Sequence, residues 1–204
     1  MQRKHTLHKK RTIKRKRAAV SRRLRGMIWT RLVPVILLVI AALVIRHQLP
    51  YYLYPNEYSA EIEAEAAVAG IDPYLVCAVI KAESNFDADA VSPVGAVGLM
   101  QIMPETGEWL AALGGLDFAA DKLYQPRYNI RLGCCYLRFL LDYWQWDVCK
   151  AVASYNAGQR NVAGWLENGI WDGTSENLQD IPFEETQKYV ERVFHIYQQY
   201  SSLY

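Results

Sequence analysis

The first 31 residues contain no aspartate or glutamate, although they hold 13 lysines and arginines. Beyond residue 45 the other 10 lysines and arginines stand against all 21 acidic residues. The formal net charge of +2 therefore conceals a basic segment and an acidic one, the latter with a balance of −11. Two segments of opposite charge are expected to meet different surroundings or different partners.

The sequence also lacks any group of histidines and cysteines with the spacing of a zinc site. The four histidines, at 5, 8, 47 and 195, are scattered. The four cysteines all lie in the acidic part: Cys77, Cys134, Cys135 and Cys149. Each stands in an apolar helical context, and two adjacent helical cysteines cannot both point at one partner. Buried free thiols are therefore the preferred interpretation, although one bridge to Cys149 stays open.

A run of fourteen uncharged apolar residues, 32–45, lies between Arg31 and Arg46. As a helix it would be about 21 Å long, short of the ~30 Å hydrocarbon core of a membrane. The apolar residues before it and snorkelling of the two arginines would lengthen it. Tyrosines 51, 52 and 54 suit the interfacial aromatic belt. We predict a basic cytoplasmic tail at 1–31, a transmembrane signal-anchor at 32–46 and a linker at 47–57.

Other interpretations of this run are a cleaved signal peptide, a buried core helix and, with the basic tail, a nucleic-acid-binding arm. A signal peptide needs a small-residue cleavage site soon after its apolar region, and "RHQLPYYLYPN" offers none. No cysteine follows the run directly to accept a lipid. The positive-inside rule explains a basic tail before an apolar run better than nucleic-acid binding does. We expect a single-pass protein of the cell membrane with a cytoplasmic N-terminus, an extracytoplasmic domain and no nucleic-acid partner.

Residues 58–204 lack any convincing alternation of apolar and polar residues, which argues against a substantial sheet. Helix signals are frequent instead. Asp72 followed by Pro73 is a strong helix start, and Pro104 and Pro126 open two further helices. Residues 85–103, rich in Gly, Ser, Asp and Pro, are expected to form a long ordered loop. The prediction is an all-α domain of about seven helices around one hydrophobic core.

The stretch "VIKAESNF" places Glu83 on the same helix face as Val76, Val79 and Ile80. One interpretation is a partly exposed helix-end glutamate, or a buried one paired with a cation such as Lys81 or an arginine elsewhere in the chain. The other is a carboxyl group in a poorly solvated cleft, where burial raises the pKa and allows proton donation near neutral pH. Position alone favours the first, because charged residues on amphipathic faces are common.

Three further motifs alter that balance. The glycines of "SPVGAVGLMQIMP", residues 92–104, would allow close backbone approach to a ligand. "ASYNAG", residues 153–158, ends a helix, and "IPFEETQKYV", residues 181–190, puts Glu185 and Tyr189 on one helix face. Each motif alone is weak. In this order they resemble the catalytic domain of the soluble lytic transglycosylases, glycoside hydrolase family 23, related to goose-type lysozyme.

The resemblance covers roughly residues 58–200. Ser154 stands where the family usually has Ala, and Gln187 where an Arg often follows Glu-Thr, which leaves the contacts of the fourth motif open. Cysteines 134 and 135 occupy a helix that is usually free of cysteine. The residues that carry the resemblance are Glu83-Ser84 with Phe86, Gly98-Leu99-Met100-Gln101 with Pro104, Tyr155-Asn156-Ala157-Gly158, and Glu185-Thr186 with Tyr189.

The resemblance implies a lysozyme-like helical fold with a substrate cleft and an enzyme that cleaves peptidoglycan strands between N-acetylmuramic acid and N-acetylglucosamine. Glu83 is implied as the general acid, and then as the base that lets the muramic acid 6-hydroxyl close a 1,6-anhydro ring. Most retaining glycosidases need a second carboxylate about 5 Å away. Asp87 and Asp89 are near in sequence, in a loop whose direction the sequence does not reveal. The implied chemistry needs neither metal nor organic cofactor.

Substrate-binding roles carried over by position fall on seven residues. Tyr155 is expected either to hydrogen-bond near the reacting sugar or to orient Glu83, while a core role for Met103 and a capping role for Asn156 are alternatives. Two competing functions are a hydrolytic muramidase on the same fold and a catalytically silent glycan-binding envelope protein. Protein partners are not indicated. The seven residues are Ser92, Gln101, Met103, Tyr155, Asn156, Glu185 and Tyr189.

Overall fold

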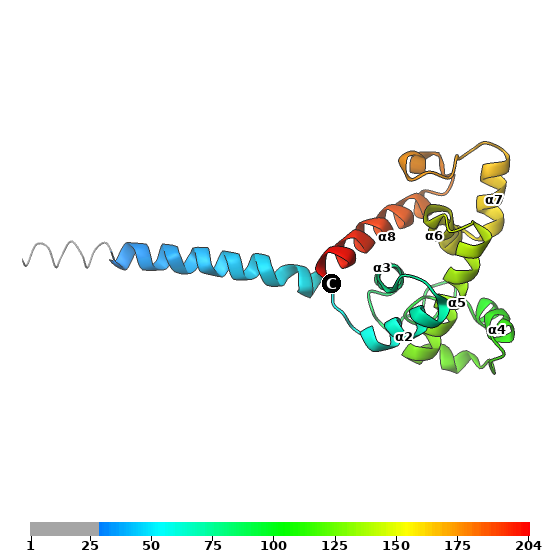
Figure 1. The fold of residues 1–204 in the computed structure, drawn as a ribbon, viewed down its shortest axis with the longest axis horizontal. Coiled ribbons are helices and arrows are strands. Elements are labelled where there is room, and N and C mark those ends of the chain that lie inside the picture. Colours follow the sequence, from blue (N-terminus) through cyan, green and yellow to red (C-terminus); the bar gives the residue numbers. More distant parts are fainter. Residues whose placement is uncertain (1–28) are drawn as a thin grey trace, which may run out of the picture. The chain divides into compact units, whose positions relative to one another are not determined.

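The computed structural model of the chain describes residues 29–204. These residues belong to two compact units, which follow one another in the sequence at Leu53 and Tyr54 (Figure 1). Nearly all of the basic tail expected at 1–31 lies outside the described residues. The two units are therefore treated one at a time.

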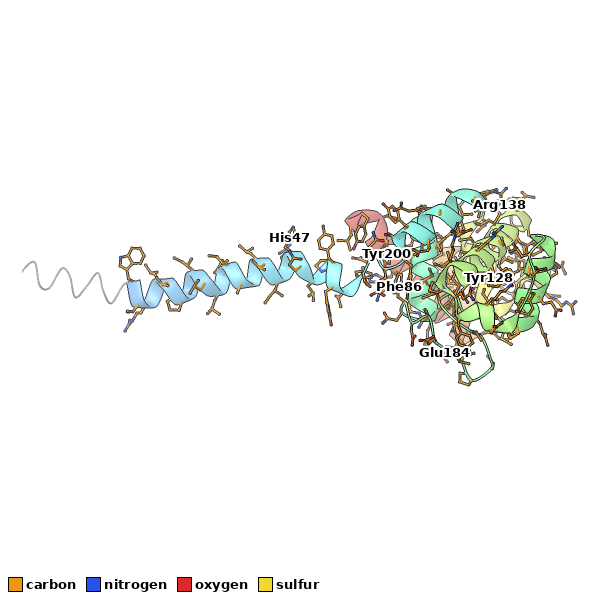
Figure 2. All side chains as sticks on the ribbon, turned by 90° about the horizontal axis from the view of Figure 1, so that it is seen from below. His47, Phe86, Tyr128, Arg138, Glu184 and Tyr200 are labelled. Atoms are coloured by element: carbon orange, nitrogen blue, oxygen red, sulfur yellow. The ribbon has the colours of Figure 1, made fainter. Side chains whose placement is uncertain are left out.

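The described part of the first unit, residues 29–53, is one helix, Trp29–Leu53, with 25 residues and a mean hydropathy of 2.2 in its most apolar part. At 1.5 Å per residue it is about 37 Å long, enough to cross a hydrocarbon core. Apolar side chains leave it on all sides (Figure 2). The helix extends beyond the predicted span of 32–46 at both ends. Residues 47–53, expected as the first part of a linker, are its last turns, and Pro50 does not end it.

The second unit contains seven α-helices and two short 3-10 helices, and its β-structure is confined to isolated bridges of Val97 with Val91 and Ile102. The prediction of an all-α domain with about seven helices is confirmed. The helices are α2 (Ser59–Ala69), α3 (Pro73–Glu83), α4 (Pro104–Leu113), η1 (Ala120–Tyr124), α5 (Pro126–Tyr143), α6 (Val148–Ala157), α7 (Gln159–Glu167), η2 (Ser175–Asp180) and α8 (Glu184–Leu203).

The helix starts follow local chemistry. The Asp72 carboxylate accepts a hydrogen bond from the Tyr74 backbone N–H at 2.8 Å, which satisfies a donor in the first turn of α3. Pro73, Pro104 and Pro126 each occupy the first position of a helix, where a missing N–H does no harm. These starts were predicted. The two 3-10 helices were not, because a single turn leaves no periodicity to read.

Helix α3 lies at the centre of this unit. Its residues from Leu75 to Ile80 are all buried, so its apolar side chains are enclosed on every face. It packs extensively against α8, which also lies against α6 (Figure 1). Phe86, just beyond α3, contacts Tyr200 of α8 with ring centroids 6.4 Å apart (Figure 2). The end of α3 is thereby held at the edge of the core, and it carries Glu83.

The chain enters this unit through residues tied to the last helix. The Tyr200 hydroxyl donates to the Pro55 carbonyl at 2.8 Å, and the Tyr204 hydroxyl donates to the Tyr54 carbonyl at 3.0 Å. The first residues after Leu53 are therefore already part of the folded domain. All four cysteines are free thiols, as the sequence favoured, and only Cys135 is partly accessible.

Candidate active site

Glu83 is the last residue of α3 and is partly buried. The following Ser84 hydroxyl donates to the Leu99 carbonyl at 2.8 Å, which binds the helix end to the loop of the second motif. Asn85 and Phe86 then adopt left-handed backbone conformations, with φ of 52° and 67°. These two residues end the helix and turn the chain directly after Glu83 and Ser84.

Among residues 29–204 the Glu83 carboxyl has one hydrogen-bond partner, the Tyr189 hydroxyl of α8, which donates to Oε1 at 2.7 Å. Burial raises the pKa of Glu83 to about 7, against the opposing effects of the Tyr189 hydrogen bond and the charge of Arg192. The charge of Glu185 adds to the increase. A substantial fraction of Glu83 is therefore still protonated at neutral pH, as a general acid requires.

The loop of the second motif is built around a buried asparagine. Asn129 of α5 donates to the carbonyls of Val97 and Leu123 and accepts from the Met100 N–H, each at 2.8 Å. Gly98 has φ of 78°, and a Cβ there would lie 2.4 Å from Asn129 Nδ2. This close approach explains why a glycine is needed at that position.

Gln101 uses its side chain within the same loop. It has a left-handed φ of 48°, and its amide donates to the carbonyls of Gly98 and Ala90 at 2.9 and 3.1 Å. The amide thus shapes the loop, while the residue still lines the cavity described below.

Tyr155 makes a different hydrogen bond from the one expected for an orienting residue. Its hydroxyl donates to the Met100 carbonyl at 2.9 Å, and burial holds the pKa of Tyr155 well above its usual range. The hydrogen bond to Glu83 comes from Tyr189 instead. The neighbouring Asn156 accepts from the Thr186 hydroxyl at 2.7 Å, which ties α6 to the start of α8.

Beside these residues lies a cavity of about 290 Å³, here called the Tyr155 cavity. Glu83 does not line this cavity, but its charge helps to raise the pKa of Tyr155, which does. Met103 is 36% exposed, which is more than a core residue would be. The cavity brings together four of the seven predicted binding residues, Gln101, Met103, Tyr155 and Asn156, and adds Thr106 and Tyr136.

The remaining predicted residues lie elsewhere. Tyr189 is buried against Glu83, and Glu185 is exposed one turn earlier on α8. Ser92 closes its own turn, because its hydroxyl accepts from the Ala96 N–H at 2.9 Å. Asp87 and Asp89 are exposed, and the Asp87 carboxylate accepts from the Asp89 N–H. These two acids therefore form a local turn.

Sequence reasoning missed several residues that build the site. Asn129 lies in an ordinary helical pattern, and nothing in the sequence marks it. Arg192, whose guanidinium lies 5.8 Å from the Tyr189 ring centre, follows that tyrosine by three residues, which is one helix turn. Tyr136, with its ring 5.0 Å from Tyr155, could have been found only from its place on the face of α5. Thr186 stood inside a quoted motif but was not assigned a role.

An all-helical domain with an aromatic-lined cavity, and with a carboxyl of pKa near 7 at the end of its buried central helix, has the features of a lysozyme-like class of protein. Residues 60–177 match the family described as "Transglycosylase SLT domain". This match covers more than half of the chain, so the chain belongs to that family. The resemblance found from the sequence motifs is confirmed.

Individual relatives agree with this assignment. The soluble lytic murein transglycosylase of Escherichia coli is 34% identical over 144 residues, which are 69% of this chain and 22% of that protein. Membrane-bound lytic murein transglycosylase C of Actinobacillus pleuropneumoniae is 34% identical over 113 residues, 50% of this chain and 31% of that one.

Among solved structures, an inactive glutamate-to-glutamine mutant of lytic transglycosylase Slt from Pseudomonas aeruginosa superposes with a TM-score of 0.68 at 33% identity. The superposition covers 73% of this chain and 24% of that one. This chain therefore spans only about a fifth to a third of the length of these relatives.

Proposed function

We propose that this protein is a membrane-anchored lytic transglycosylase of peptidoglycan, with Glu83 as its general acid and base. The observation that carries the proposal is the Glu83 carboxyl, with a pKa near 7 and a hydrogen bond from Tyr189 at 2.7 Å. Family membership supports the reaction class, and the relatives named above are murein transglycosylases. Inactivation of one relative by a glutamate-to-glutamine change agrees with an essential carboxyl.

In the first step the protonated Glu83 donates its proton to the glycosidic oxygen between N-acetylmuramic acid and N-acetylglucosamine. The C1–O bond breaks, N-acetylglucosamine leaves as the alcohol, and C1 becomes electron-poor. Tyr189 stabilises the carboxylate that this step leaves behind, because its hydroxyl already points at Oε1.

In the second step the muramic acid 6-hydroxyl attacks C1, and the Glu83 carboxylate takes up the hydroxyl proton. This closes the 1,6-anhydro ring and returns Glu83 to its starting form. The nucleophile belongs to the substrate, so the mechanism does not need the second carboxylate of an ordinary retaining glycosidase. Asp87 and Asp89, engaged in their own exposed turn, are consistent with this.

The helix Trp29–Leu53 is proposed as the membrane anchor. Its length and hydropathy suit a single span, and the lysines and arginines of residues 1–31 favour a cytoplasmic N-terminus. The catalytic unit, which follows at Tyr54, would then face the peptidoglycan outside the membrane.

Product mass tests the reaction. The full-length chain in lipid nanodiscs should release muropeptides with 1,6-anhydro ends, which are one water lighter than hydrolysis products. Glu83→Gln should lower the rate by about 100-fold or more, because the amide keeps the shape of the side chain but cannot donate a carboxyl proton. Glu167→Gln, an exposed acid at the end of α7, is the matched control and should stay active.

Two outcomes would contradict the proposal. Products carrying an added water at the new end would indicate a hydrolytic muramidase that uses Glu83 to activate water. Binding of strands without cleavage, unchanged in Glu83→Gln, would indicate a silent glycan-binding protein.

A further inference from the structure

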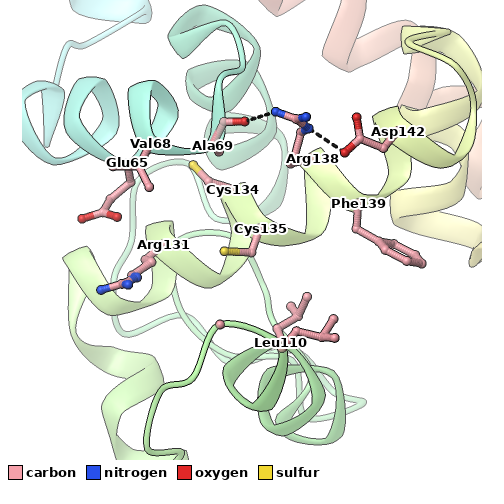
Figure 3. A pocket seen from close by; sticks show the side chains of 12 residues that line it. Glu65, Val68, Ala69, Leu110, Arg131, Cys134, Cys135, Arg138, Phe139 and Asp142 are labelled. Carbon is pink, nitrogen blue, oxygen red and sulfur yellow. Dashed lines mark hydrogen bonds and ion pairs between the residues drawn. The ribbon is translucent and has the colours of Figure 1, made fainter.

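A second cavity, of about 380 Å³, lies between α2, α4 and α5 (Figure 3). Its volume is in the range of small-molecule sites. Its lining is mainly apolar and includes Val68, Leu110, Leu113 and Phe139. Val68 and Leu113 are 80% and 65% exposed, so the apolar surface continues onto the rim. None of the roles assigned above uses this cavity, which we call the arginine-rimmed pocket.

Of the charged side chains around this pocket, one cation has no ion-pair partner among residues 29–204. Glu65 is 5% exposed and is paired with Arg127 at 2.9 Å. Arg138 is also engaged, because it donates to the Asp142 carboxylate at 2.7 Å and to the Ala69 carbonyl at 2.8 Å (Figure 3). Arg131, by contrast, is exposed and makes no ion pair in the part of the chain that the structure describes.

Arg131 is an exposed cation in an otherwise acidic part of the chain. Residues 46–204 carry a charge balance of −11, yet three of their ten basic residues are arginines of α5 at or next to this pocket. A pocket with an apolar floor and an unpaired guanidinium fits a ligand that combines small apolar groups with a carboxylate.

The same surface leads to the Tyr155 cavity. Thr106 lines that cavity and Leu113 lines the arginine-rimmed pocket. They are seven residues apart, on one face of α4 and about 10 Å along it. Between them Trp109, 39% exposed, packs edge-on against Tyr136 and Phe139 of α5, with ring centroids 6.3 and 5.0 Å away.

We propose that the arginine-rimmed pocket binds the peptide stem of the peptidoglycan substrate, with Arg131 holding one of the stem carboxylates. Stem peptides combine alanine methyl groups with free carboxylates, which matches the apolar floor and the unpaired cation. The stem hangs from the muramic acid lactyl group, so a strand held at the Tyr155 cavity can lay a stem along α4. This inference rests on the proposed function, because it assumes a peptidoglycan substrate.

Kinetics on two substrates provides the first test. The full-length chain in nanodiscs would be assayed on peptide-bearing strands and on strands stripped of their stems by an amidase. Arg131→Ala should raise KM for peptide-bearing strands about fivefold, the effect of losing an ion pair of about 1 kcal/mol, with kcat unchanged. Arg131→Glu should raise this KM further, and Arg131→Lys should raise it less than Arg131→Ala does. Kinetics on stripped strands should not change.

Lys188→Ala is the matched control, because it also removes one exposed cation, from an exposed pair with Glu184. It should leave both substrates unaffected. Equal changes of Arg131→Ala on both substrates, or no change on either, would overturn the proposal.

A binding measurement makes the test independent of turnover. The Glu83→Gln chain should bind the isolated tetrapeptide stem in a calorimetric titration, and adding Arg131→Ala should weaken that binding about fivefold. Bound stem should also slow alkylation of Cys135, the partly accessible thiol that lines the pocket. Absence of binding, or equal binding to the Arg131→Ala form, would refute the pocket assignment. Absence of anhydro products, by contrast, would refute the proposed function. It would leave the result of the binding measurement unaffected.

Discussion

At the residue scale the central feature is a single carboxyl group whose environment favours its neutral form. Glu83 is the last residue of a helix that is buried on every face, and its side chain is therefore poorly solvated. Tyr189 and Arg192 favour the charged form, and burial outweighs both. The resulting pKa of about 7 suits the role proposed for Glu83, in which one carboxyl gives and then takes up a proton at the same pH.

The raised pKa of Glu83 should make the free energy of unfolding depend on pH. The pKa of Glu83 is about 7 in the folded chain against an ordinary value of 4.5. Between these values the folded state binds more protons than the unfolded state, so the free energy of unfolding falls as pH rises. Glu83→Gln does not titrate and should therefore be more stable than wild type by about 3 kcal/mol above pH 7, but by little below pH 4. Thermal unfolding at pH 4, 6 and 8 measures this, and a difference independent of pH would contradict it.

Tyr189→Phe removes the donor that stabilises the Glu83 carboxylate. The pKa of Glu83 should rise further, so the decline of kcat/KM at high pH should move up by about one pH unit. The rate itself should fall about tenfold, because the carboxyl loses its orientation. The pH dependence of kcat/KM measures both effects.

Tyr197→Phe is the control on the same helix, since it removes a hydroxyl that donates to the Asp72 carboxylate at 2.6 Å, away from Glu83. A profile unchanged in Tyr189→Phe would show that this hydrogen bond does not tune Glu83.

At the scale of elements, the site depends on a loop held to α5 by one asparagine. Met100 and Gln101 belong to this loop. Asn129 of α5 binds the Met100 N–H, and the Tyr155 hydroxyl of α6 donates to the Met100 carbonyl. The position of Gly98 is what permits this contact.

Gly98→Ala should therefore destabilise the domain by about 2–4 kcal/mol, because the new methyl group would meet Asn129 and the Leu123 carbonyl. Gly95→Ala is the matched control. Gly95 has a similar positive φ of 90° but nothing within 4 Å of a Cβ, so only the backbone penalty of about 1 kcal/mol is expected. Urea unfolding of both variants separates the two effects, and equal losses would argue against the steric explanation.

The helices were predictable and the contacts between them were not. Asp72 and Pro73 announce α3 by local chemistry, and the glycine that ends α2 does the same. The hydrogen bond between Ser84 and the Leu99 carbonyl joins residues 15 positions apart, and that between Asn129 and Met100 joins residues 29 apart. Sequence periodicity carries no information about contacts at such separations. For the same reason the motifs indicated that Tyr155 and Tyr189 matter but not which of them reaches Glu83.

At the scale of the whole molecule, the proposed anchor makes a simple prediction. The full-length chain should sediment with membranes and resist carbonate extraction, because a 25-residue apolar helix inserts as a span. A variant lacking residues 1–53 should stay in the soluble fraction. Protease added outside intact protoplasts should digest residues 60–200, and protection of that segment would reverse the proposed orientation.

The carbonyls of Tyr54 and Pro55, which accept hydrogen bonds from Tyr204 and Tyr200, show that the folded domain begins directly after the helix proposed as the membrane anchor. Because the helix ends at Leu53, very few residues would link the proposed membrane span to the catalytic domain. Such an enzyme would be confined to the glycan layer nearest its own membrane, and its action would be set by where the protein sits in the plane of that membrane rather than by diffusion through the wall.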